Sequence, residues 1–248
     1  MWNRIADGDV LTINKIEVFM VLSPAELSAL VLSIKIGLVA ASVALPFAIA
    51  SAWVLARVNF PGRWLFGAIL HLPLVLPPVV IGYLLLIGFG RNGLIGSVLL
   101  SCCNLSFSFR WTGAALASGI MAFPLMIRAI RISIEAIDRR LEESASILGA
   151  SPILVGLTVT LPLAAPGILA AYILGFAKAL GEFGATITFV SNIPGETQTL
   201  PLAIYSFMQD PNGDAMVIRL AVLSIVVSVI AIGGSEWMAA RFRNRISA

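Results

Sequence analysis

The sequence has 248 residues, 59% of them hydrophobic and only 12% charged, with a formal net charge of +3. Because a soluble domain of this length carries roughly 25% charged residues, the shortage of charge indicates a membrane protein. The net charge is too small to favour nucleic acid as a partner, and the adjacent Cys102 and Cys103 suit neither a metal site nor a disulfide framework. We therefore expect an all-α bundle in a lipid bilayer, without metal or cofactor.

Residues 1–27 mix acidic and basic side chains and lack the basic-then-apolar pattern of a signal peptide. After them, several stretches have the ~20 mostly apolar residues that a helix needs to cross a hydrocarbon core. Five such spans are predicted, at about 28–56, 64–88, 112–134, 163–190 and 215–238. They define a transmembrane domain over 28–238, followed by a tail at 239–248.

The first span carries small residues on one face. These residues recur every three or four positions and are Ser33, Gly37, Ala41, Ala44, Ala48, Ala52 and Ala56. Helices in lipid gain little from burying apolar groups against one another, so close packing of small residues has to hold them together. We expect this face to pack against another helix.

The second span contains Pro77 and Pro78, shortly after His71, the only histidine. Each proline removes a backbone donor and disturbs the preceding turn, and broken backbone at membrane depth is tolerated only inside protein or beside a water-filled cavity. This helix is therefore expected to face the bundle interior and to line a pathway. His71 is interpreted as a structural residue rather than a proton relay.

Lysine and arginine in the loops predict the orientation, because cytoplasmic loops are enriched in them. One side holds Arg57, Arg63, Arg128, Arg131, Arg139, Arg140, Arg241, Arg243 and Arg245; the other holds Arg4, Lys15, Arg91 and Arg110. Nine positions against four predict that the first side is cytoplasmic, with the N-terminus outside and the C-terminus in the cytosol.

The loop 135–162 is the longest predicted cytoplasmic segment. One apolar helical face is formed by Ile130, Ile134, Ile137, Leu141, Ala145 and Leu148, and away from it lie Arg139, Arg140, Glu142 and Glu143. Gly149 is expected to end this helix and Ser151-Pro152 to begin another. The pattern predicts two short amphipathic helices in the cytosol, the first continuous with the third span, whose apolar face needs a partner protein.

A partner is also needed for energy. The sequence contains no G-x-x-x-x-G-K-[ST] phosphate loop and no soluble domain that could bind a nucleotide. Any energy from ATP would have to come from another subunit.

The segment Glu143-Ser144-Ala145-x-x-x-Gly149, followed after nine residues by Val159-x-Leu161-Pro162, resembles the EAA loop of ABC-importer permeases. The spacing agrees throughout, while Ser144 replaces the usual Ala and Val159 the usual Ile. The resemblance implies that this loop grips a cytosolic ATPase. The residues expected to make that contact are Glu143, Ser144, Ala145, Leu148, Gly149, Leu161 and Pro162.

Two further segments, His71–Val80 and Ala179–Thr197, are similar to those of molybdate ABC-transporter permeases; sulfate/thiosulfate permeases share the Gly181–Gly184 core. The resemblance implies a bacterial inner-membrane homodimer that works by alternating access, with two copies of an ATPase and a periplasmic molybdate-binding protein. Hydrolysis would lie in the ATPase, so this chain is expected to be a transport subunit with no catalytic residues. Sulfate, thiosulfate and tungstate remain alternative substrates.

The residues of the transport pathway or its gate are less clearly indicated by the sequence than those of the loop. Its candidates are Gly181, Glu182, Phe183 and Gly184, which interrupt the fourth span, together with Pro77 and Pro78. Alternatively, Glu182 only pairs with Lys178 at i, i+4.

Two rival functions use the same residues differently. A proton-driven secondary transporter would need His71, Lys35 and Glu182 as a relay, but five spans without an inverted repeat fit that class poorly. A membrane-embedded enzyme would need a catalytic constellation, and no cluster of His, Cys or paired acids lies within the spans.

Overall fold

The structure is a computed structural model that describes residues 22–246, with side chains described up to residue 234. It is helical, and the described residues contain no strand, which confirms the predicted all-α class. Most of the expected N-terminal segment and the side chains of the C-terminal arginines lie outside the described residues. The helices are α2 (Pro24–Arg57), α3 (Arg63–Val75), α4 (Pro78–Phe89), α5 (Leu94–Cys103), α6 (Trp111–Glu135), α7 (Arg139–Ile147), α8 (Pro152–Val155), η1 (Gly156–Thr160), α9 (Leu161–Leu180), α10 (Gly184–Val190), α11 (Leu200–Phe207) and α12 (Asp214–Ile246).

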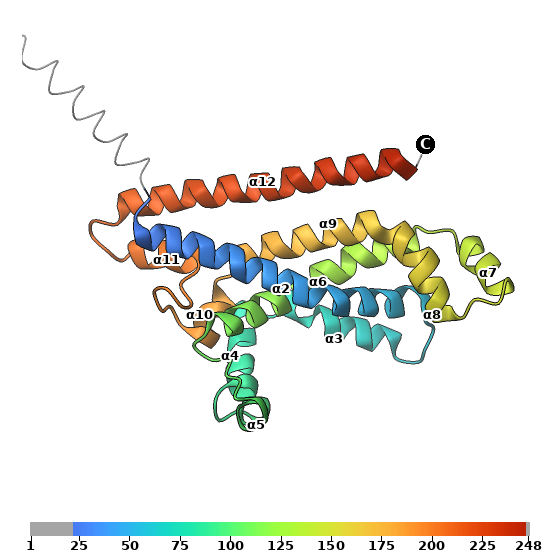
Figure 1. The fold of residues 1–248 in the computed structure, drawn as a ribbon. Helices are drawn as coiled ribbons and strands as arrows, with labels where there is room; N and C mark the ends of the chain where they lie inside the picture. Colours follow the sequence, from blue (N-terminus) through green and yellow to red (C-terminus); the bar gives the residue numbers. More distant parts are fainter. Residues whose placement is uncertain (1–21, 247–248) are drawn as a thin grey trace, which may run out of the picture.

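Three long helices, α2, α6 and α9, pack side by side and form the centre of the bundle (Figure 1). The predicted small-residue face of α2 is confirmed as buried, since Ala41, Ala48 and Ala52 are each 0% exposed. Larger side chains on α6, among them Met126 and Ile130, fill the space beside this face. Small residues on one helix therefore let bulky residues on the next come close, as expected for helices that pack within lipid.

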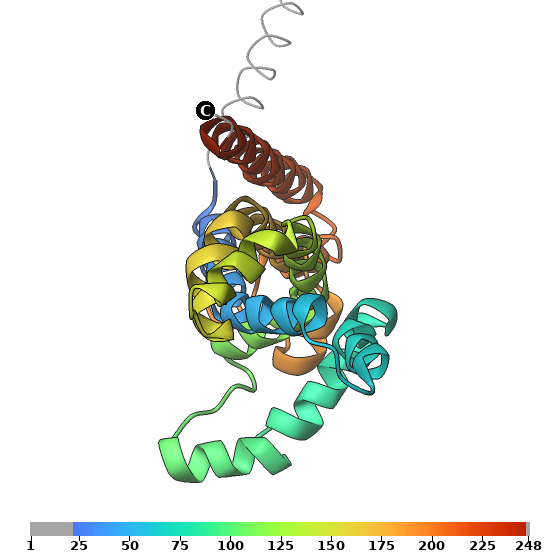
Figure 2. The same ribbon diagram turned by 90° about the vertical axis from the view of Figure 1, so that its right-hand side faces the viewer.

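The predicted second span is not one straight helix. It divides into α3 and α4, which are bent by 109° at the break around Pro77. The reason is local, because Pro77 lacks an N–H and α4 begins at Pro78, where a missing donor costs nothing. Figures 1 and 2 both show α4 leaving the bundle with α5 at its far end. The helix α5 was not predicted from the sequence, since its 10 residues are too few for a span.

The predicted fourth span also divides, as the glycines in it indicated. The helix runs from Pro152 through η1 to Leu180, breaks at residues 181–183, and resumes as α10. The last predicted span lies in α12, which continues as a helix to Ile246. Residues 239–246, expected to form a separate tail, therefore extend this helix. Within residues 22–246, four helices are long and apolar enough to cross a membrane, or five when the bent α3–α4 pair is counted as one span.

Candidate functional site

The predicted loop 135–162 lies beyond the end of the bundle formed by the C-terminus of α2 and the start of α9 (Figure 1). We call this the loop end. The expected helix from the third span through Leu148 is not continuous, because α6 ends at Glu135 and the Asp138 carboxylate caps a new helix by accepting from the Arg140 N–H at 3.0 Å. Asp is among the best N-cap residues, so the break follows from the local sequence.

The second predicted loop helix is also different from the expectation. Ser151 caps α8 as predicted, with its hydroxyl accepting from the Leu154 N–H at 3.3 Å. However, α8 continues through η1 into α9 without an interruption. The loop thus consists of one free helix, α7, and the projecting first turns of a long helix that enters the bundle.

The helix α7 is anchored to the bundle by Glu142. Its carboxylate oxygens lie 3.0 and 3.1 Å from Arg57 Nε at the end of α2, and it accepts a hydrogen bond from Thr160 Oγ1 at 2.6 Å. Arg57 also donates through Nη2 to the carbonyls of Ile134 and Ile137. One arginine therefore joins α2, the end of α6 and α7. The sequence placed Glu142, like Glu143, away from the apolar face of this helix, and its pairing with Arg57 was not predicted.

Several large apolar side chains at the loop end face outward. Leu148 is 89% exposed, Ile147 86% and Ile153 72%. Of these, Leu148 was expected on one face with Ile130 and Ile134, but those two are buried in the bundle core. The predicted face is therefore divided, because the chain turns between α6 and α7. Its outer half remains uncovered, which is unusual for a protein surface without a partner.

Beside these residues lies a cavity of about 790 Å³ between α7 and the ends of α2 and α8. Its lining includes Trp53, Arg57, Glu143 and Ile147. Glu143 makes no hydrogen bond or ion pair with the described residues, whereas the neighbouring Glu142 is fully engaged. A free carboxylate beside an open apolar cavity is available to a basic group or a backbone donor of another protein.

The turn after α7 depends on Gly149. Its φ is +88°, in the left-handed region that glycine adopts at little cost. A Cβ there would meet no atom within 4 Å, so the requirement is for backbone conformation and not for space within this chain.

The remaining predicted contact residues lie on either side of this turn. Ser144 is exposed, with its hydroxyl donating to the Arg140 carbonyl, and Ala145 is half-buried. Leu161 is half-buried and Pro162 exposed in the first turn of α9, beyond the π-helical segment. The structure thus brings Ser144 and Gly149 into one exposed segment. Leu161 and Pro162 lie elsewhere, within the continuous helix formed by α8, η1 and α9.

The candidate pathway residues form the break between α9 and α10. Glu182 is 2% exposed; it accepts from Lys178 Nζ at 2.7 Å and from the Ala185 N–H at 3.1 Å. The pairing of Lys178 with Glu182 is confirmed, and Glu182 also caps α10. Gly181 and Phe183 instead line a cavity of about 400 Å³ between α9, α11 and α12. In this cavity the ring centroids of Phe183 and Tyr205 are 5.2 Å apart.

The two helix breaks pack against each other. The expectation that the second span faces the bundle interior is wrong for the described chain, because α3 has no buried residue and Pro77 and Pro78 are exposed. A Cβ on Gly184 would lie 2.8 Å from the Cβ of Pro78, and one on Gly82 would lie 2.6 Å from the Ala185 carbonyl oxygen. The start of α10 therefore packs directly on the start of α4. This brings Pro78 and Gly184 together, while Pro77 forms the bend before them.

Sequence reasoning also missed the buried ion pair of Glu26 with Arg219. Their atoms Oε1 and Nε are 2.9 Å apart, and the side chains are 0% and 8% exposed. The pair ties the start of α2 to α12. The available signal was Arg219 itself, since an arginine within an apolar span needs a partner, but nothing local identified Glu26, 193 residues away, as that partner.

Comparisons with known proteins agree with this architecture. Residues 44–244 match the family model described as binding-protein-dependent transport system inner membrane component. The molybdenum transport system permease protein ModB of Haemophilus influenzae is 54% identical over 221 residues, covering 89% of this chain and 96% of that protein. ModB of Escherichia coli K12 is 50% identical over 226 residues, with 91% and 99% covered.

More distant proteins share the fold. A bacterial ABC transporter involved in the import of the acidic polysaccharide alginate superposes with a TM-score of 0.71 at 17% identity, covering 92% of this chain and 83% of that chain. The MetNI methionine ABC transporter gives a TM-score of 0.65 at 16% identity, with 89% and 99% covered.

The fold and the family match define a membrane-spanning transport subunit, not an enzyme. The chain belongs to the family of inner membrane components of binding-protein-dependent transport systems, and it is a multi-pass inner-membrane protein.

Proposed function

We propose that this chain is the permease subunit of an ATP-driven importer that carries molybdate across the bacterial inner membrane. The observation that carries the proposal is the 54% identity to a molybdenum transport permease over 96% of that protein's length. The segments His71–Val80 and Ala179–Thr197, similar to those of molybdate permeases, form the two helix breaks of the bundle. The two segments contact each other where Gly184 packs on Pro78.

The loop end provides the attachment for a cytosolic ATPase. Leu148 and Ile147 offer an uncovered apolar surface, and Glu143 offers a free carboxylate beside it. Glu142 is held by Arg57 and Thr160, so a displacement of α7 is transmitted to both α2 and the long helix α8–α9. This three-way connection takes the role that a continuous helix from the third span would have played.

The full assembly in this proposal is a homodimer with two ATPase copies and a periplasmic molybdate-binding protein. A solved protein of the same fold supports the last partner, since it is a bacterial alginate ABC transporter in complex with a periplasmic protein, with a TM-score of 0.68. The arginine distribution supports an orientation with the loop end and the C-terminus in the cytosol and the N-terminus in the periplasm.

Alternating access in this assembly would use the contact between the two helix breaks. The start of α10 packs on the start of α4, and α10 follows α9 directly after the break at residues 181–183. A movement of the long helix α8–α9 would therefore displace the contact of Gly184 with Pro78. Of the pathway candidates, Gly181 and Phe183 are the two that line the cavity between α9, α11 and α12. Glu182 is a positioning residue, since it holds the start of α10.

Sulfate is the second candidate substrate, because the sulfate transport permease CysW of Synechocystis is 35% identical over 206 residues. A proton-driven transporter has less support, because the groups of its relay are engaged. His71 Nδ1 lies 2.7 Å from the Gly67 carbonyl, Glu182 is paired with Lys178, and Lys35 Nζ lies 3.7 Å from the Trp111 ring centroid.

Two measurements test the proposal. Uptake of radiolabelled molybdate should require this chain, and unlabelled molybdate should compete where sulfate in excess does not; equal competition by sulfate would favour the second candidate. The ATPase should co-purify with the wild type but not with Leu148→Asp. The control is Met208→Asp, which charges a side chain that is 69% exposed at the opposite end of the bundle. Retention of the ATPase by Leu148→Asp would exclude the loop-end attachment.

A further inference from the structure

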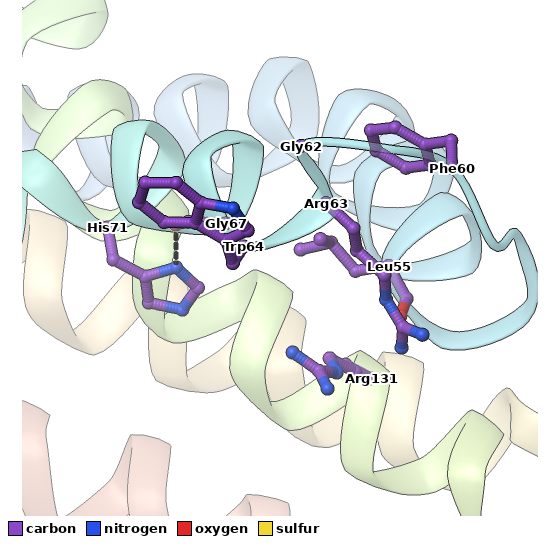
Figure 3. A pocket seen from close by; sticks show the side chains of 8 residues that line it. All are labelled: Leu55, Phe60, Gly62, Arg63, Trp64, Gly67, His71 and Arg131. Atoms are coloured by element: carbon purple, nitrogen blue, oxygen red, sulfur yellow. Dashed lines mark hydrogen bonds between the residues drawn. The ribbon is translucent and has the colours of Figure 1, made fainter.

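A second cavity at the loop end is lined by basic and aromatic side chains (Figure 3). It has a volume of about 550 Å³ and lies between the C-terminal end of α2, residues 63–71 of α3 and the C-terminal end of α6. Figure 3 shows the guanidinium groups of Arg63 and Arg131 on neighbouring sides of it, with His71 and Trp64 toward the other end. The loop 135–162, which we call the coupling loop, contributes no residue to this cavity.

The cavity carries an excess of positive charge. Arg63 donates to the Leu55 carbonyl and the Asn59 side chain, and among the described residues it pairs with no carboxylate. Arg131 uses Nε to contact Glu135 at 2.7 Å, and both side chains of that pair are more than a third exposed. Of the two guanidinium groups, only that of Arg131 therefore has a carboxylate partner among the described residues.

The unused hydrogen-bond donors of the cavity indicate which chemical group it can bind. The two terminal nitrogens of Arg131 and Nε of Arg63 make no hydrogen bond with any residue in the described part of the chain. His71 uses Nδ1 toward the Gly67 carbonyl, which leaves Nε2 free. Arginine forks of this kind match the oxygens of a phosphate group, which can accept two parallel hydrogen bonds.

The surroundings favour a phosphate that belongs to a lipid. Trp64 is 78% exposed, and tryptophan concentrates at the level of lipid headgroups. From the cavity, Leu65, Ile69 and Leu72 continue along α3 as an exposed apolar stripe at helical spacing. A basic cavity at the membrane interface, followed by an apolar stripe toward the bilayer centre, has the layout of a phospholipid headgroup and its acyl chain.

We propose that this cavity binds the phosphate group of an anionic phospholipid in the leaflet at the loop end. The excess cation selects an anionic lipid over a zwitterionic one, since basic pockets between membrane helices on the cytoplasmic side favour such headgroups. Arg131 is the main phosphate donor, with Arg63 beside it and Trp64 positioned against the glycerol region. The site is separate from the coupling loop and does not depend on the transported substrate.

Native mass spectrometry of the full-length protein in mild detergent tests the proposal, with titration of phosphatidylglycerol or phosphatidylcholine. The wild type should bind phosphatidylglycerol in preference. Arg131→Gln should weaken that binding about five-fold, from the typical contribution of one basic residue near an anionic headgroup. Arg131→Lys, which keeps the charge, should bind more tightly than Arg131→Gln. Arg128→Gln is the matched control, because Arg128 is exposed one turn away on α6 and does not line the cavity.

The outcomes separate the sources of phosphate. If the wild type bound both lipids equally, or if Arg128→Gln weakened binding as much as Arg131→Gln, the proposal would be wrong. Displacement of phosphatidylglycerol by inorganic phosphate at the same concentration would assign the cavity to a soluble oxyanion and overturn the lipid proposal. Failure of inorganic phosphate to compete, together with the loss in Arg131→Gln, would support it.

Discussion

The turn at Gly149 allows backbone conformation to be separated from direct contact at the coupling loop. With φ at +88° and no atom within 4 Å of the position that a Cβ would occupy, Gly149→Ala creates strain without an internal clash. A residue with a Cβ in the left-handed region costs about 1–2 kcal/mol. If the turn relaxes to escape that strain, the binding-competent fraction falls by about 5- to 30-fold, and the apparent affinity for the ATPase falls by the same factor.

The assay is equilibrium binding of the purified ATPase to the permease in nanodiscs. Gly149→Asn should bind more tightly than Gly149→Ala, because Asn tolerates the left-handed region better. Gly149→Asp has a similar backbone tolerance but adds a charge beside the exposed Leu148, so it should bind more weakly than Gly149→Asn. The order of affinities then shows how much of the effect is conformational.

Gly195 provides the matched control. It also has a positive φ, +77°, with open space around it, but lies in the loop between α10 and α11 at the other end of the bundle. Gly195→Ala should therefore carry similar local strain and leave ATPase binding unchanged. If Gly149→Ala bound the ATPase as tightly as the wild type, or if Gly195→Ala weakened binding equally, the reasoning would be refuted.

Three further predictions concern stability and topology. Glu26→Gln removes one charge of the buried Glu26–Arg219 ion pair and should lower the unfolding free energy by about 3–5 kcal/mol, measured by thermal unfolding in detergent; an unchanged midpoint would show that the pair is not needed. Gly82→Ala should lower the midpoint of thermal unfolding, because its Cβ would lie 2.6 Å from a backbone oxygen of α10. Gly88→Ala on the same helix has open space around it and should leave the midpoint unchanged. Equal midpoints for the two variants would contradict the packing of α4 on α10. Without the native cysteines, Gln209→Cys should react with an impermeant thiol reagent in intact cells and Ser146→Cys only after permeabilisation, and the reverse pattern would invert the proposed orientation.

Local patterns in the sequence were sufficient for much of the fold. The small-residue face of α2 is buried because its spacing follows the helix period, and that period is independent of the neighbouring helix. The break at residues 181–183 follows from the residues themselves. Asp138 carried an equally local signal, since it is a typical N-cap, but the apolar periodicity from Ile130 to Leu148 suggested a continuous helix instead.

Short helices were harder to predict. α5 and α11 have 10 and 8 residues, too few to be recognised as spans, and their apolar residues are consistent with a loop or a helix. Only packing decides between these alternatives. In α11, for example, Leu202 and Ala203 are buried, and the Leu200 N–H donates to Ser33 Oγ of α2 at 2.6 Å.

The sequence by itself determined the class of protein, because transfer of apolar residues into lipid is a sum over the residues of each stretch and needs no knowledge of neighbours. It also located the turn at Gly149, because the conformation of a glycine at the end of a helix is a local backbone property. The tertiary structure alone decided which of two adjacent acids anchors the loop, Glu142 through Arg57, and which acid neutralises Arg219. Such pairings join residues far apart in the chain, and they depend on helix direction and crossing geometry, which no local pattern contains.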